Sequence, residues 1–207
     1  MTDAKAFIET ESCLLRDERP SINLRKMSRD DWPQLSYFGS LLKLKDTGQS
    51  PVYHPEGSVW EHTMLVVDEA AKRKAQSTDS RVFMWAALLH DMGKPATTRS
   101  RNGRITAYNH DRVGAEAAEK MLLSLTSDAE FSRETAMLIL YHMQPLYVEK
   151  NLPFKNIPGM ERDTDVRDVA LLGLCDRLGR KGADPREVEA GIADFLKKCG
   201  AENPGGL

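Results

Sequence analysis

The histidines and two of the aspartates are the residues whose types and spacing could do chemistry in this chain. His90 and Asp91 stand side by side at the end of an apolar run, "FMWAALL". Helical spacing turns His62 and His142 toward apolar faces, and His110 opens another helical segment. Buried charges are costly unless they are paired, hydrogen-bonded or bound to metal. The pattern therefore requires a partner for the His90–Asp91 pair.

Asp176 adds a second carboxylate, on the apolar face of the segment 163–179. Each of these residues alone has a plainer explanation, such as a hydrogen-bonded core histidine or an aspartate paired with Arg177 or Arg180. Together they come from five successive helical segments or their ends, and bundles build ligand sites where such groups converge. Imidazole and carboxylate suit Zn, Fe, Mn, Ni and similar divalent ions. The set favours a metal site, in which the ion compensates Asp91 and keeps the histidines neutral.

The elements that must position these residues are predicted to be helices. Ser58 and Glu61 form a capping box, and Asp184 with Pro185 opens the last helix. "RNGR" predicts a short hairpin, and a loop interrupted by prolines is expected over 146–160. Apolar spacing predicts helices over about 31–47, 58–73, 80–89, 110–125, 129–143, 163–179 and 184–199. The fold class expected is all-α, a helical bundle with the metal site at its centre.

Composition limits the function classes. The chain has 207 residues, 41% hydrophobic and 29% charged, with a formal net charge of −2. There is no global basic field, so strong binding of double-stranded nucleic acid is not expected. The three cysteines, Cys13, Cys175 and Cys199, show no CxxC spacing, which favours a reducing cytoplasm over a disulfide framework. No secretory signal or membrane-spanning run is predicted. The oligomeric state is left open.

The ordered set H…HD…H…H…D resembles the HD-domain superfamily of metal-dependent phosphohydrolases. The phrases "HPEGSVWEHTMLVVD", "AALLHDMGKPATT", "GRITAYNHDRVGAEAAEKML" and "CDRLGRKG" are similar to the HD domain of bacterial CCA-adding tRNA nucleotidyltransferases and of HD–polynucleotide kinase fusions. The resemblance covers roughly residues 30–182. The domains expected are an N-terminal arm or helical lead-in over 1–27, the HD domain over 28–199 and a flexible tail over 200–207.

The resemblance implies the activity and its limits. Related HD domains hydrolyse phosphoesters, including 2′,3′-cyclic nucleotides and terminal phosphates of RNA. No nucleotidyltransferase sequence comes before the HD segment in this chain, and no G-x-x-x-x-G-K-[ST] loop occurs in it. Nucleotide addition and kinase activity are therefore not expected. The expected substrate is a nucleotide or RNA-end phosphoester, cleaved by a hydroxide that two metal ions activate.

The family pattern also implies the ligands of two divalent ions. The first ion would be held by His62, His90, Asp91 and Asp176, and the second by His110, His142 and the other oxygen of Asp91. A carboxylate that bridges two ions explains why an aspartate follows a ligand histidine directly. Mn, Ni, Co, Fe, Mg and Zn all fit some HD site, so the metal is not identified.

Further side chains are candidates for catalysis and substrate binding. Asp91, Lys94 and His110 are assigned to the catalytic set, with Lys94 stabilising phosphate charge. Lys94, Arg177, Arg180 and His54 are candidates for contact with the substrate, and His54 could donate a proton to the leaving group. The plainer alternatives are a solvated lysine at a helix end, surface salt bridges, and a loop histidine that closes a turn.

Two other functions compete with phosphoester hydrolysis. Some HD proteins carry the same ligand set around a di-iron centre that activates O₂ on a small molecule. The third alternative is a module that binds a nucleotide without catalysis and uses metal only structurally. The closer similarity to the tRNA-enzyme HD domain favours hydrolysis over both.

Overall fold

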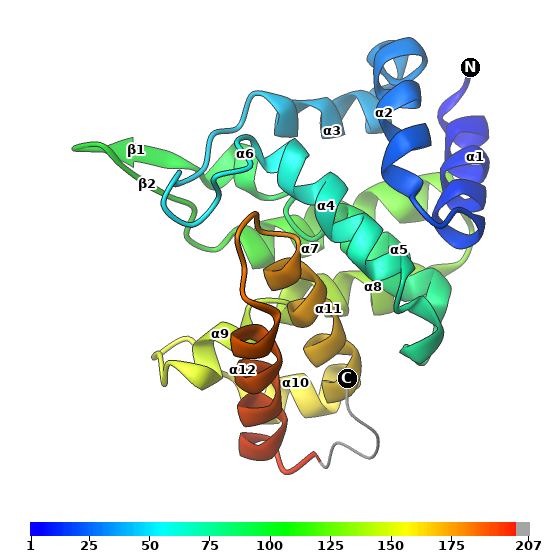
Figure 1. Cartoon of the computed structure of the whole chain (residues 1–207). Helices are drawn as coiled ribbons and strands as arrows, with labels where there is room; N and C mark the ends of the chain where they lie inside the picture. Colours follow the sequence, from blue (N-terminus) through cyan, green and yellow to red (C-terminus); the bar gives the residue numbers. More distant parts are fainter. Residues whose placement is uncertain (202–207) are drawn as a thin grey trace.

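The computed structural model describes residues 1–201 and is almost entirely helical (Figure 1). The principal helices that surround the site are α4 (Val59–Ala71), α5 (Ser80–Leu89), α7 (His110–Leu125), α8 (Ala129–Tyr141) and α11 (Val166–Leu178). The other elements are α1 (Asp3–Arg16), α2 (Pro20–Asp30), η1 (Trp32–Gln34), α3 (Ser36–Leu41), η2 (Leu42–Lys45), η3 (Lys74–Gln76), α6 (Lys94–Thr97), β1 (Arg99–Arg101), β2 (Arg104–Thr106), α9 (Gln144–Glu149), α10 (Ile157–Asp163) and α12 (Pro185–Lys198). The all-α prediction is confirmed.

Helix α5 is the centre of the bundle. Every residue from Val82 to Leu89 is buried, as expected for a helix that is apolar all round. Helix α5 packs against α1, α4, α8 and α11, and α7 lies along α8. The side chain of Asp79 caps the first turn by accepting from two backbone N–H groups. The helix ends at Leu89, so His90 and Asp91 emerge in the middle of the bundle.

The N-terminal segment belongs to the core of the fold. Residues 1–27, expected as an arm or helical lead-in, form α1 and most of α2. Phe7 of α1 stacks on Trp85 of α5, with 4.8 Å between ring centroids, and buries the middle of the central helix. The single helix predicted over about 31–47 is wrong. It is divided into η1, α3 and η2: Leu35 is extended between η1 and α3, and the Asp3 carboxylate of α1 accepts from the backbone N–H groups of Ser36 and Tyr37 where α3 begins.

Several local predictions are confirmed, and others are corrected. Asn102 and Gly103 both have positive φ, so "RNGR" turns the hairpin β1–β2, which projects from the bundle (Figure 1). The loop predicted over 146–160 is partly helical, since prolines begin α9 and α10 instead of interrupting them. The expected tail, 200–207, lies outside the described residues except for its first two. Within residues 1–201, each helix is too short or too polar to cross a bilayer.

The capping box at the start of α4 is half formed. The Ser58 hydroxyl accepts from the Glu61 N–H at 3.4 Å, as predicted. The Glu61 carboxylate instead accepts two hydrogen bonds from the Arg25 guanidinium on α2, at 2.7 and 2.8 Å. The bidentate pair fastens the N-terminal helices to α4 and so supports the helix that carries His62.

Candidate metal centre

Six buried histidine and aspartate side chains meet at the C-terminal end of α5. They come from five helices or their ends, and each is at most 7% exposed. The members are His62 from α4, His90 and Asp91 after α5, His110 at the start of α7, His142 after α8, and Asp176 from α11. These are the six residues that the resemblance implied as ligands, and the fold brings all of them together.

Backbone carbonyl groups fix the orientation of three of the imidazoles. The Nδ1 atoms of His90, His110 and His142 lie 2.9, 2.7 and 2.6 Å from the carbonyl oxygens of Ala87, Ala107 and Ile139. A carbonyl oxygen only accepts, so each Nδ1 carries the proton. In the neutral ring each Nε2 is then a lone pair directed into the cluster, which is the tautomer that a metal ligand needs.

The unpaired atoms inside the cluster fit a bound cation. The Nε2 atoms of His110 and His142 are 3.2 Å apart, although both carry lone pairs. The Nε2 atom of His90 is buried without a hydrogen-bond partner among the described residues and lies 3.2 Å from Oδ2 of Asp91, an oxygen that also faces the Lys94 ammonium. Such separations match adjacent ligands on an ion whose bonds are about 2.1 Å long. Left empty, this arrangement would repel itself, so the donor set fits a divalent metal.

Within residues 1–201, the ligand-type atoms fall into three groups, of which two share the carboxylate of Asp91; the third consists of His54, Glu56 and His62. His62, His90 and Asp91 form the first group, and Asp91, His110 and His142 form the second. Asp176 adjoins the first group, with Oδ1 2.9 Å from Nε2 of His62. In the second group, Oδ1 of Asp91 lies 3.5 Å from Nε2 of His110. Asp91 is therefore the side chain that the first two groups have in common.

Two glycines allow the turn after Asp91 to approach α7. A Cβ at Gly93 would lie 2.1 Å from the His110 carbonyl oxygen and 2.6 Å from the backbone nitrogen of Gly114. A Cβ at Gly114 would in turn lie 3.2 Å from the Gly93 nitrogen. The lack of side chains at both positions brings the His90–Asp91 turn into contact with the first turn of α7. The glycine in "HDMGK" thus helps to place Asp91 beside His110.

His62 lies between two carboxylates. Its Nε2 faces Asp176, and its Nδ1 lies 3.0 Å from Oε1 of Glu56. The same Glu56 oxygen accepts from Nδ1 of His54 at 2.8 Å, and the Glu56 side chain is 1% exposed. A neutral ring can donate to only one carboxylate. With a cation on Nε2, the proton remains on Nδ1 for Glu56, in the carboxylate–histidine–metal arrangement that orients ligands in proteins.

The charges of the cluster set its protonation states. Burial by itself raises the pKa of Asp91, but the Lys94 ammonium and the His90 ring hold that pKa well below its ordinary value. Burial, followed by the neighbouring His110 and His90, lowers the pKa of His142 to about 4. For Asp176, Arg180 outweighs burial and keeps the pKa well below the ordinary value. At neutral pH the aspartates are therefore ionised and His142 is neutral, the forms that bind metal.

A cavity of about 320 Å³ opens onto the centre. His54, Lys94 and His110 line it on the side of the cluster. The Lys94 ammonium is 2.7 Å from Oδ2 of Asp91 and donates to Oε1 of Gln49 at 2.7 Å. A mostly buried cation thus stands between the shared aspartate and the cavity, where it can bind an anionic group that enters.

The remaining predicted contacts divide between two places. Arg180 donates to Oδ2 of Asp176 at 2.9 Å, so it belongs to the border of the centre. Arg177 lies 2.7 Å from the carboxylate of Glu149 on α9, away from the cluster. A guanidinium held there ties α11 to α9, so the expectation that Arg177 contacts substrate is not supported by its position. His54 lines the cavity, and burial, then His62 and Lys94, lower its pKa to about 4.

Two polar side chains at the centre were not predicted. Glu56 belongs to the phrase "HPEGS", in which a glutamate between proline and glycine is typical of a turn, so its sequence context offered no reason to place it at the centre. Its position two residues after His54 was the feature that could have indicated its role. Gln49 stands in a loop before the first clear motif, and nothing in its spacing connects it with Lys94.

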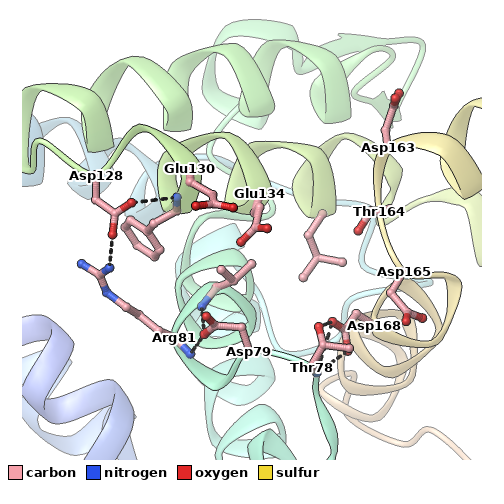
Figure 2. Close-up of a pocket in the computed structure, with 13 residues that line it drawn as sticks. Thr78, Asp79, Arg81, Asp128, Glu130, Glu134, Asp163, Thr164, Asp165 and Asp168 are labelled. Carbon is pink, nitrogen blue, oxygen red and sulfur yellow. Dashed lines mark hydrogen bonds and ion pairs between the residues drawn. The ribbon is translucent and has the colours of Figure 1, made fainter.

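A second cavity, of about 470 Å³, lies at the opposite end of α5 (Figure 2). Its wall is rich in carboxylates, which the figure shows gathered around Arg81 and Thr78. Most of the groups near α5 already have partners: Arg81 donates to Asp128, and Thr78 donates to Asp168 through both its backbone N–H and its hydroxyl. Hydrogen bonds and ion pairs within the protein account for the acidic side chains near α5, and we assign no functional site to this cavity.

The fold and the cluster define a helical domain built around a divalent-metal ligand set. Comparison with known families agrees: the model of the HD domain family matches residues 59–194. The chain belongs to the HD domain family, and the resemblance drawn from the sequence is confirmed. Domains of this family bind divalent metals, and the buried histidines and aspartates are groups that could hold one.

The relatives found include a multifunctional CCA protein and a CC-adding tRNA nucleotidyltransferase. The chain is 25% identical over 209 residues to the multifunctional CCA protein of Actinobacillus pleuropneumoniae, covering 98% of this chain and 50% of that protein. It is 30% identical over 174 residues to the CC-adding tRNA nucleotidyltransferase of Thermus thermophilus, covering 83% of this chain and 38% of that protein. The chain thus spans half or less of the length of these relatives.

Proposed function

We propose that this protein is a metal-dependent phosphohydrolase that cleaves phosphoesters of nucleotides or RNA ends. The observation that carries the proposal is the position of Asp91. It is shared by two ligand groups, and the Lys94 ammonium stands beside it at the edge of a cavity. A cation placed next to a proposed metal ligand suits an anionic substrate, and this supports a phosphoester as the substrate.

Each side chain has a task in this proposal. His62, His90, Asp91 and Asp176 would hold one ion, and His110, His142 and Asp91 would hold another. When bound, two such ions supply Lewis acidity and activate the attacking water. Lys94 binds a phosphoryl oxygen and stabilises the charge that develops on it.

The protein's own groups near the cavity complete the scheme. His54 lines the cavity, but its pKa is lowered to about 4 and its Nδ1–H is donated to Glu56, so the neutral ring offers the substrate an acceptor at Nε2, and the expected proton donation to the leaving oxygen is not proposed. Arg180 neutralises the outer oxygen of Asp176 and is, of the two predicted arginines, the one that contacts a side chain of the cluster. One of the relatives named above is a tRNA nucleotidyltransferase, and this supports RNA ends as the substrate class. The cysteines are unpaired, which suits the reducing cytoplasm where we place the protein.

The test is hydrolysis of 2′,3′-cyclic AMP by chelator-stripped protein reloaded with Mn, Ni, Co, Fe, Mg or Zn in turn. We expect turnover with at least one metal, and we expect Asp91→Ala to lose it. Glu130→Ala, which removes a carboxylate at the opposite end of α5, is the matched control and should retain full activity. If metal-loaded protein consumes O₂ in the presence of iron but hydrolyses no phosphoester, the oxygenase alternative replaces this proposal.

A further inference from the structure

Three aromatic side chains form a boundary between two hollows. Tyr108, Tyr147 and Phe154, called here the aromatic wall, line the cavity of about 320 Å³ that reaches Lys94 and His110. The same three side chains also line another cavity, of about 360 Å³, which is separate from the one at the opposite end of α5. We call these hollows the inner and the outer cavity. Because the aromatic wall belongs to both, it presents ring surface to each of them.

The aromatic wall is open to solvent, although it is largely apolar. Tyr108 is 66% exposed and Phe154 is 57% exposed. Phe154 packs on Tyr147 with 5.6 Å between ring centroids, so the two rings support one another. The three residues come from separate segments, after β2, in α9, and between α9 and α10. Exposed rings beside a polar cavity are the platforms on which proteins stack unpaired bases.

The inner cavity carries polar atoms that have no protein partner. The Nε2 atom of Gln49 and the hydroxyl of Thr98 are buried without a hydrogen-bond partner among the described residues. Both residues line the inner cavity, on the side of Lys94. A buried amide donor and a hydroxyl left unpaired are costly, and a ligand that presents hydroxyl or base-edge acceptors satisfies them. A ribose and its base offer such groups.

Exposed arginines line both the inner and the outer cavity. Arg104 of the hairpin lines the inner cavity, and Arg112 of α7 lines the outer one. Neither guanidinium lies within ion-pair distance of a carboxylate in residues 1–201, so both are available to phosphate. Arg99 and Arg101 lie on the same hairpin, and Arg101 is likewise exposed. A chain of phosphates that leaves the inner cavity therefore meets positive charge on its way out.

We infer that the substrate is a single-stranded RNA end of at least two nucleotides, bound across the aromatic wall. The terminal nucleotide occupies the inner cavity with its phosphate at Lys94. The next base lies in the outer cavity against the other side of the aromatic wall, and its phosphate faces Arg112. This inference rests on the proposed function and goes beyond it by setting the length and strandedness of the substrate. A paired base would not present a free face to the rings.

The experiment compares two substrates that share one scissile bond. The dinucleotide ApA ending in a 2′,3′-cyclic phosphate and the mononucleotide 2′,3′-cyclic AMP are hydrolysed side by side by metal-loaded protein. We expect kcat/KM to be about tenfold or more higher for the dinucleotide. Phe154→Ala and Arg112→Ala should remove most of this preference. Leu123→Ala, an exposed apolar residue outside both cavities, should leave it unchanged.

A binding measurement separates this inference from the proposed function. Calorimetric titration of chelator-stripped protein compares 3′-phosphorylated ApA with 3′-AMP, neither of which needs turnover. Tighter binding of the dinucleotide that Phe154→Ala abolishes, without hydrolysis by any metal form, would support the inference and overturn the hydrolase. Equal kcat/KM for the two cyclic substrates, or a preference that both variants retain, would overturn the inference and leave the hydrolase standing.

Discussion

The two ends of α5 both gather ionisable side chains, but they treat them differently. At the N-terminal end, Asp79 caps the helix and Asp168 accepts from Thr78 (Figure 2). At the C-terminal end, the buried Nε2 atom of His90 has no hydrogen-bond partner among the described residues, and the Nε2 atoms of His110 and His142 lie 3.2 Å apart. The carboxylates that flank the start of the helix are hydrogen-bonded within the protein, whereas the side chains at the other end direct lone pairs at one another.

The difference shows how an acidic cluster that only stabilises the fold can be distinguished from a functional site. Carboxylates are numerous at the N-terminal end, yet those near the helix start accept hydrogen bonds from backbone, hydroxyl or guanidinium groups. At the C-terminal end the histidine tautomers are fixed by carbonyl groups so that Nε2 atoms face inward. The number of charged groups is therefore less informative than the atoms that remain unpaired after the fold is complete.

Matched substitutions of one buried aspartate at each end should give the largest contrast. Asp91→Asn removes a metal ligand, so hydrolysis of 2′,3′-cyclic AMP should fall to background while the melting temperature of the metal-free protein changes little. Asp168→Asn weakens the hydrogen bonds from Thr78, so it should cost about 1–2 kcal/mol of stability and leave kcat unchanged. Enzyme kinetics and denaturant unfolding measure the two effects. If folded Asp168→Asn protein lost activity, this would contradict the expectation that only the C-terminal end of α5 is needed for hydrolysis.

The cations beside the two ends should differ in the same way. Lys94→Ala should lower kcat about 100-fold with metal still bound, because a phosphate-stabilising charge is lost next to Asp91. Arg81→Ala should lower the free energy of unfolding by about 1–2 kcal/mol, because Arg81 joins Glu11 to Asp128. Its kcat should be unchanged. Elemental analysis that finds metal missing from Lys94→Ala would reassign this lysine to assembly of the centre.

The carboxylate behind His62 should have a moderate effect. Glu56→Gln keeps the size of the side chain but removes the charge that faces Nδ1 of His62, so affinity for Mn²⁺ should fall about 10- to 100-fold. Calorimetric titration measures the dissociation constants. Glu130→Gln, at the other end of α5, is the control and should bind Mn²⁺ as the unaltered protein does. Unchanged affinity in Glu56→Gln would remove Glu56 from the set that orients the ligands.

The smallest effect is expected from charge repulsion at the acidic end. Burial, and then Glu130, Asp79 and Asp128, raise the pKa of Glu134. A carboxyl whose folded-state pKa is raised favours folding below its unfolded pKa, and this advantage is lost as the pH rises through the folded pKa. Glu134→Gln cannot ionise, so its gain should be absent at pH 3 and reach at most about 0.5 kcal/mol at pH 7. Urea unfolding at both pH values measures it, and a gain at pH 3 would contradict this cause.

The meeting of the six histidine and aspartate side chains could be predicted from the sequence because they lie in helical segments or at their ends, whereas their role as metal ligands rests on the family resemblance. Helical spacing turns His62 and His142 inward, and an apolar run sets His90 and Asp91 at its end. Glu56 and Gln49 could not be predicted, because they lie in loops whose course depends on tertiary packing. Arg177 and Arg180 looked alike in sequence. Their separation of three residues points them to different neighbours, and only the fold distinguishes Glu149 from Asp176 as the partner.

The contribution of the N-terminal helices to the core, in contrast, could not be predicted from the sequence. Residues 1–27 have weak patterning, and their contribution to the core rests on few large side chains. Phe7 reaches Trp85 across the bundle, a contact between segments almost eighty positions apart, which no local periodicity contains. The break of the predicted helix at Leu35 has the same origin, since the carboxylate of Asp3, more than thirty positions earlier in the chain, accepts from the backbone N–H groups of Ser36 and Tyr37.

The most direct measurement is a Co²⁺ titration of chelator-stripped protein, followed by visible absorption and calorimetry. We expect two Co²⁺ per chain and absorption bands of histidine-bound cobalt. Asp91→Ala should lose the bound Co²⁺ and these bands, and Asp168→Asn should behave as the unaltered protein. Absence of Co²⁺ binding, or full binding retained in Asp91→Ala, would contradict a metal centre at the C-terminal end of α5.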